Sequence, residues 1–105
     1  MTSFEDRKKS FENKYARDAE LQFKVEARRN RLLGEWAAEL LGLEGDAKAA
    51  YAKDVVKADF QEAGDDDVFR KVEADLGEKV PAAEIRAKMD ALLEEAKHQV
   101  MSEPT

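Results

Sequence analysis

Apolar residues recur at helical spacing along most of the chain. In four segments they fall three, four or seven positions apart, which places their side chains on one face of an α-helix. These segments cover about residues 21–41, 47–63, 66–76 and 81–102. Gly42, Gly64 and Gly77 follow the first three segments, at the position that glycine favours after a helix. The pattern predicts four amphipathic helices.

Each predicted helix has an apolar face that we expect to be buried. The four faces, in chain order, are Leu21, Val25, Leu32, Trp36 and Leu40; Ala49, Ala52, Val56, Phe60 and Ala63; Phe69, Val72 and Leu76; and Ile85, Met89, Leu92, Leu93, Ala96 and Val100. Asp46 is the candidate N-cap of the second helix, and Pro81 suits the first turn of the last. Gly34, inside the first helix, is expected to allow close packing.

The first 18 residues have a different pattern. Phe4, Phe11 and Tyr15 line one narrow sector of a helical wheel, but that sector meets polar residues before it becomes apolar again at Leu33. We therefore expect an all-α fold: a four-helix bundle in residues 19–105, preceded by a mobile, helix-competent arm in residues 1–18.

Composition and charge agree with this division. Charged residues make up 40% of the chain and hydrophobic residues 43%, and there is no Cys, which excludes disulfides and thiolate chemistry. The net charge is -6, yet residues 1–31 hold nine Lys and Arg against six Asp and Glu. A basic arm thus precedes an acidic body. No segment has the roughly 20 apolar residues of a membrane span, so we expect a cytoplasmic protein without membrane insertion.

The residues needed for catalysis or metal binding do not form a recognisable set. His98 is the single histidine, no Gly-rich phosphate loop occurs, and the serines lie near the chain ends. The acidic run of Asp65, Asp66 and Asp67 lacks the alternation and the glycine of a calcium loop, so it is interpreted as a helix cap. We expect neither enzymatic activity nor a metal site.

Arg28, Arg29 and Arg31 form the cluster that best suits RNA phosphates. Acidic residues at pairing distance lie on the same predicted helix: Glu20, Glu26, Glu35 and Glu39. These pairs and the acidic body make nucleic acid a poor partner.

The aromatic stripe of the arm has two interpretations. The arm can fold back and cover part of the bundle, or its aromatic side chains can anchor it in a groove of another protein. The residues alone leave these two interpretations nearly even.

Two long stretches carry a family resemblance. They are FEDRKKSFENKYARDAELQFKVEARRNRLLGEWAAELLG and VVKADFQEAGDDDVFRKV, of which RNRLLGEWAAELLG and ADFQEAG are the most specific parts. Together they resemble the zeta subunit of alpha-proteobacterial F-type ATP synthases, a small inhibitor of ATP hydrolysis. The resemblance implies a four-helix body with an N-terminal inhibitory region. That region would insert as a helix between an alpha and a beta catalytic subunit, beside the gamma subunit of the central stalk, and block rotation in the hydrolytic direction.

The resemblance also implies which residues bind the partner. These are Phe4, Asp6, Arg7, Lys8, Phe11, Lys14, Tyr15 and Arg17, with the aromatic residues as anchors. It implies a location on the cytoplasmic side of the inner-membrane enzyme and no required cofactor. The alternative function is a regulatory helical bundle that binds adenine nucleotides weakly, at a site that the sequence does not identify.

Overall fold

The computed structural model describes residues 3–59 and 65–103, and the side chains of this part from Glu5 onward. Within it the chain is all-α, as predicted. The elements are α1 (Ser3–Arg17), α2 (Ala19–Leu40), α3 (Gly45–Ala58), α4 (Asp66–Leu76), the 3-10 turn η1 (Gly77–Lys79) and α5 (Ala82–Ser102).

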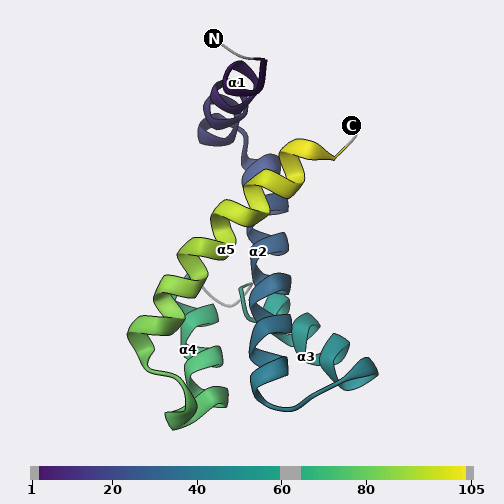
Figure 1. Cartoon of the computed structure of the whole chain (residues 1–105), viewed down its shortest axis with the longest axis vertical. Coiled ribbons are helices and arrows are strands. Elements are labelled where there is room, and N and C mark those ends of the chain that lie inside the picture. The colour runs from purple at the N-terminus through teal and green to yellow at the C-terminus, as the bar shows by residue number, and fades with distance from the viewer. Residues whose placement is uncertain (1–2, 60–64, 104–105) are drawn as a thin grey trace.

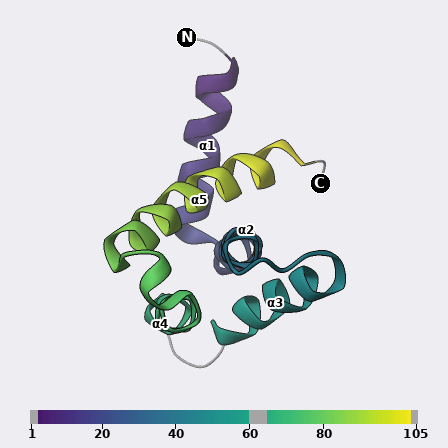
Figure 2. The ribbon, with the colours of Figure 1, turned by 60° about the horizontal axis from the view of Figure 1, so that its bottom comes forward.

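Helix α2 is the centre of the fold, because α3, α4 and α5 all pack against it. Helices α3 and α4 lie toward one end of α2, and α5 crosses it (Figure 1). Helix α1 lies at the opposite end of the molecule, and its N-terminus projects away from the other helices (Figure 2). The chain is elongated, with extents of 45 × 27 × 24 Å.

Among the described side chains, the main core contains none from α1. It joins helices α2 to α5 through buried side chains, namely Leu33, Ala37, Val55, Val68, Val72, Leu76, Val80, Ile85 and Met89. A second, smaller cluster lies between α2 and α5 and consists of Val25, Ala96 and Val100. Five partly buried residues surround that cluster, and two of them, Phe11 and Tyr15, come from α1.

Gly34 is the point of closest approach between α2 and α3. A Cβ atom placed on Gly34 would lie 2.7 Å from the Cα of Ala52 and 3.3 Å from the Cβ of Val55. Real Cβ atoms do not approach backbone so closely, so only glycine fits with this helix spacing. The prediction of close packing at Gly34 is confirmed.

The second predicted helix differs from the structure in its ends and its buried face. Helix α3 covers Gly45–Ala58 rather than 47–63, and its N-cap is Glu44 instead of Asp46, which lies in the first turn. The buried face consists of Ala52, Val55 and Ala58, whereas Ala49 is exposed and Val56 is half-buried. Ala52 was predicted correctly, but an alanine-rich helix has little apolar contrast between its faces, so Val56 was predicted to be buried in place of Val55. Phe60, Ala63 and Gly64 lie outside the described residues.

The other three helices agree with their predicted ranges to within two residues. The predicted face of α2 agrees less well. Val25 is fully buried, but Leu21, Leu32 and Trp36 are half-buried and Leu40 is 41% exposed, whereas Leu33 and Ala37, outside the predicted face, are buried. Gly77 ends α4 with a φ of 59° and a ψ of -129°, a combination that glycine adopts readily and that a residue with a Cβ atom rarely does. Pro81 is the N-cap of α5, one position before the first turn.

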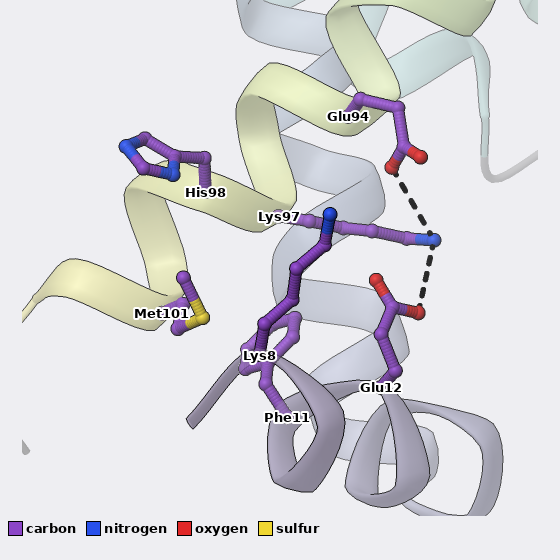
Figure 3. Close-up of a pocket in the computed structure, with 7 residues that line it drawn as sticks. All are labelled: Lys8, Phe11, Glu12, Glu94, Lys97, His98 and Met101. Carbon is purple, nitrogen blue, oxygen red and sulfur yellow. Dashed lines mark ion pairs between the residues drawn. The ribbon is translucent and has the colours of Figure 1, made fainter. Parts of the chain in front are cut away.

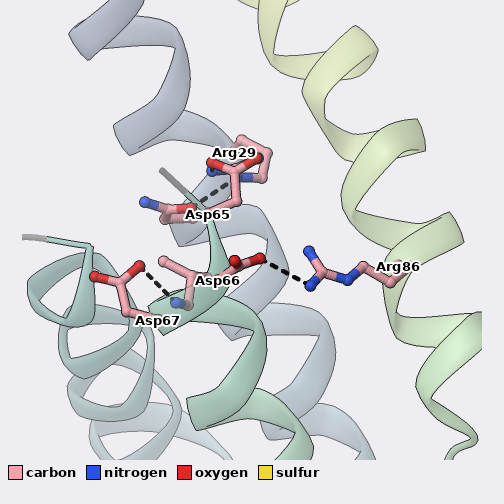
Figure 4. A network of polar contacts seen from close by, with 7 residues as sticks. Arg29, Asp65, Asp66, Asp67 and Arg86 are labelled. Atoms are coloured by element: carbon pink, nitrogen blue, oxygen red, sulfur yellow. Dashed lines mark hydrogen bonds and ion pairs between the residues drawn. The ribbon is translucent and has the colours of Figure 1, made fainter. Parts of the chain in front are cut away.

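The acidic run at the start of α4 pairs with arginines as well as beginning a helix (Figure 4). Asp65 occupies the N-cap position of α4 but forms no side-chain cap bond. It instead accepts hydrogen bonds from the guanidinium of Arg29 at 3.0 and 3.4 Å, and Asp66 accepts one from Arg86 at 2.9 Å. The cap interpretation was therefore incomplete, because these carboxylates link α4 to α2 and α5.

The arginines of α2 bind partners that sequence spacing did not indicate. Arg28 pairs with Glu103 at the end of α5, and Arg29 pairs with Asp65. Arg31 alone of the three pairs as predicted, with Glu35 four residues away at 3.7 Å. Two of the three cations are thus used to join helices.

Candidate functional site

Helix α1 is rich in charged residues and is joined to α2 through a break in the helix at Asp18. Its first turn holds Glu5 and Asp6, and its last turn holds Lys14 and Arg17, the arrangement that complements a helix dipole. At Asp18 the backbone becomes extended, with a ψ of 107°, and the Asp18 carboxylate accepts a hydrogen bond from the N–H of Leu21 at 3.2 Å. Asp18 therefore ends the first helix and caps the second.

The residues predicted to bind a partner separate into two groups. Asp6, Arg7, Lys8, Lys14 and Arg17 are exposed to solvent, whereas Phe11 and Tyr15 are half-buried. The side chain of Phe4 lies outside the described part of the chain. The structure thus brings Phe11 and Tyr15 together on one face of α1 and leaves the charged residues facing solvent.

The rings of Phe11 and Tyr15 are stacked one helical turn apart. Their centroids are 6.4 Å from each other and their planes differ by 18°. Both rings pack against the smaller apolar cluster of Val25, Ala96 and Val100. Of the two interpretations of the aromatic stripe, the structure thus shows the arm folded back onto the body at these two positions, because the break at Asp18 turns α1 toward α5.

Polar contacts also connect α1 to the body, and the sequence analysis did not identify them. The ammonium group of Lys97 on α5 lies 3.6 Å from the Glu12 carboxylate and 4.6 Å from the centroid of the Tyr15 ring. The side-chain amide of Gln22 donates a hydrogen bond to the backbone carbonyl of Tyr15 at 2.8 Å. Burial raises the pKa of the Tyr15 hydroxyl, the Glu26 carboxylate raises it further, and Lys97 acts in the opposite direction.

A hollow of about 330 Å³ separates part of α1 from α5 (Figure 3). It is lined by Lys8, Phe11, Glu12, Glu94, Lys97, His98 and Met101. A second hollow of about 300 Å³ lies beside Phe11 and Lys14 and also reaches Met101. Phe11 borders both hollows, so its ring is not closely covered on either of these sides.

The described residues contain no group of three or more side chains that could together hold a metal ion. His98 is exposed on α5, at the edge of the hollow beside α1. In the same part of the chain, no helix is both long enough and apolar enough to cross a membrane. Helix α1 and its contacts are therefore the strongest candidate site.

Comparisons with known proteins identify the family of the chain. A search of curated proteins finds no significant match. A solved structure, determined by solution NMR, is 58% identical to this chain, with a TM-score of 0.75, and the match covers 80% of this chain and 99% of that one. The family profile described as ATPase inhibitor subunit zeta matches residues 1–99, including all of α1. The chain therefore belongs to the family of zeta-type ATPase inhibitor subunits, which are non-catalytic regulators of the ATP synthase.

Proposed function

We propose that α1 is the inhibitory element of this subunit. In this proposal, α1 inserts as a helix into an interface between an alpha and a beta catalytic subunit, beside the gamma subunit of the central stalk. The protein acts on the cytoplasmic side of the enzyme, where the catalytic head is located. The observation that carries the proposal is that the main apolar core joins α2 to α5 and contains none of the described side chains of α1.

The chemistry of α1 suits insertion between two protein surfaces. Phe11 and Tyr15 provide a continuous aromatic face, and complete burial of such a side chain contributes about 1.5–3 kcal/mol. Their present burial is partial, so transfer into a closed groove buries additional apolar surface. The exposed cations Arg7, Lys8 and Arg17 can then contact acidic or polar groups around that groove.

Inhibition follows from selective binding to one conformation. A helix that fits only one state of a catalytic interface stabilises that state by its difference in affinity for the two states. A rotary enzyme held in one state cannot complete its cycle. Rotation in the synthetic direction would reopen the interface and release α1, which makes the block specific for hydrolysis.

An ATPase assay of the isolated catalytic head tests this proposal. The full-length protein should inhibit hydrolysis, and a form without residues 1–17 should not. Asp18 is retained in the shortened form because its carboxylate caps α2. Circular dichroism of that form must show a folded helical body, since loss of helix would show that the body needs α1 in order to fold. Inhibition by a folded, shortened protein would overturn the proposal.

The directional part of the proposal needs a separate measurement. Membrane vesicles that contain the complete ATP synthase can be assayed for ATP hydrolysis and for proton-driven ATP synthesis. We expect the full-length protein to reduce hydrolysis while synthesis continues. Equal loss of both rates would contradict a direction-dependent block but not the role of α1 in inhibition.

Nucleotide binding is a second candidate, supported by the hollow between α1 and α5. Lys8 and Lys97 supply positive charge and Phe11 supplies a ring on which a base can stack (Figure 3). However, the Lys97 ammonium is 3.6 Å from both the Glu12 and the Glu94 carboxylates, which weakens its attraction for a phosphate. Titration of the full-length protein with ATP and ADP tests this candidate. Saturable amide shifts at these residues would support it.

A further inference from the structure

We propose that Lys97 holds the inhibitory helix on the body of the free protein, so that α1 must be released before its aromatic face can bind a partner. This inference rests on the proposed function of α1. It goes beyond that function because it assigns a regulatory contact to a residue of α5, distant in sequence from the arm.

Lys97 is positioned to bind two groups of α1 at once. Its ammonium lies 4.6 Å from the centre of the Tyr15 ring and 3.6 Å from the carboxylate of Glu12. Only 17% of the Lys97 side chain is exposed, so its aliphatic part is also covered. Figure 3 shows the Lys97 side chain extending from α5 toward Glu12 on α1.

The contact with the body and the proposed contact with a partner use the same face of α1. Phe11 and Tyr15 lie against Val25, Ala96 and Val100, and the proposed function needs those two rings as anchors. One face of a helix cannot lie on the body and in a groove of another protein at the same time. The two states therefore compete, and any residue that stabilises the docked state slows insertion.

The docked state is only moderately stabilised. Hollows lie on two sides of Phe11, so little apolar surface is sealed there. The side chains of Asp6 to Ser10 are exposed, so α1 meets the body through the half-buried side chains of Phe11, Glu12 and Tyr15. A cation–π contact and a partly exposed ion pair together favour docking by about fivefold to tenfold. Such a contact holds α1 but still permits its release.

The test uses the full-length protein and the variant Lys97→Met, which keeps an unbranched apolar side chain and removes the charge. Lys88→Met is a matched control, because Lys88 is also on α5 and lies over an aromatic ring, 5.7 Å from the Trp36 centroid, but away from α1. Nitrogen-15 relaxation reports the order of amides 11–17 in each form. The rate at which inhibition of the catalytic head begins is measured in parallel.

We expect Lys97→Met to lower the heteronuclear NOE of residues 11–17 and to accelerate the onset of inhibition by about fivefold, with no change in Lys88→Met. Unchanged order of residues 11–17 in Lys97→Met would overturn the inference. Increased motion without faster onset would overturn the link to inhibition. If no form inhibits, the proposed function fails, and the relaxation data still decide whether Lys97 holds α1.

A charge exchange provides a second check. Lys97→Glu should loosen α1 more than Lys97→Met, because a carboxylate would face Glu12 and the electron-rich face of Tyr15. Adding Glu12→Lys restores the ion pair but not the cation–π contact, so it should recover part of the lost order. No recovery in the double variant would show that the ion pair does not contribute to docking.

Discussion

The guanidinium of Arg29 on α2 lies 3.0 Å from the carboxylate of Asp65 at the start of α4, and the Arg29 side chain is only 2% exposed. Arg29 also donates a hydrogen bond to the side-chain oxygen of Asn30 at 2.7 Å. A buried cation needs such partners, because burial without compensation is costly. This pair fixes the beginning of α4 against the central helix.

Replacement of Asp65 with Ala should therefore destabilise the protein. It removes the carboxylate partner from a buried guanidinium, for which we expect a loss of about 1–3 kcal/mol in the free energy of unfolding. Asp66→Ala is the matched control, since its pair with Arg86 is exposed on both sides, at 46% and 67%, and should be worth less than about 1 kcal/mol. Urea unfolding of both variants measures the difference. Equal losses would contradict a special role for the buried arginine.

Gly34→Ala should destabilise the protein although alanine is the better helix former. Helix propensity alone favours the change by about 1 kcal/mol. The added Cβ would lie 2.7 Å from the Cα of Ala52, and backbone at that distance has to move. Overpacking of this kind costs about 1–3 kcal/mol or more, so the net effect should be a loss. A higher melting temperature for Gly34→Ala would show that α2 and α3 can separate at little cost.

Glu26→Gln should stabilise the protein near pH 7 and have little effect near pH 4. Burial is the main cause that raises the pKa of Glu26 above its ordinary value of 4.5, and the Asp59 and Asp65 carboxylates add to the increase. The folded state thus binds this proton more tightly than the unfolded state does. The penalty for the ionised carboxylate is complete above the folded pKa and is relieved as the pH falls through it.

Urea unfolding of Glu26→Gln and of the unmodified protein at pH 7 and pH 4 measures this effect. Glu73→Gln, at an exposed position of α4, is the control for the loss of one negative charge. The prediction is wrong if Glu26→Gln is stabilised equally at both pH values, or if Glu73→Gln reproduces its pH dependence.

The sequence was sufficient to predict the elements with strong apolar contrast. In α5, Ile85, Met89, Ala96 and Val100 are all buried, as the spacing of three, four and seven residues predicts. The contrast is weak in α3, where neighbouring Val55 and Val56 are equally apolar, and Val56 was predicted to be buried although Val55 is the buried residue. Local pattern cannot separate two such positions, because the packing of α2 against α3 decides which one is buried.

The candidate site is formed by contacts between helices, which a helical wheel of one segment does not show. The wheel assumed one continuous helix through Asp18, whereas the chain begins a new helix at Ala19 and changes direction there. Phe11 and Tyr15 consequently meet α5 instead of the stripe of α2. Lys97 is distant from Glu12 in sequence, so spacing along one helix could not pair them. What the sequence did identify is the aromatic face itself and its separation from the main core.

Phe11→Ala should have a small effect on stability and a large effect on inhibition, if α1 acts as proposed. Phe11 is half-buried, borders two hollows and belongs only to the smaller apolar cluster, so we expect a loss of about 1 kcal/mol or less on unfolding. Leu33→Ala, in the fully buried main core, should cost about 2–5 kcal/mol in the free energy of unfolding.

Two measurements on both variants separate these effects: thermal unfolding, and inhibition of ATP hydrolysis at a temperature below both melting temperatures. Folded Leu33→Ala should still inhibit, whereas Phe11→Ala should require a higher concentration for the same inhibition. The reverse order in both measurements would show that Phe11 serves the fold rather than a partner.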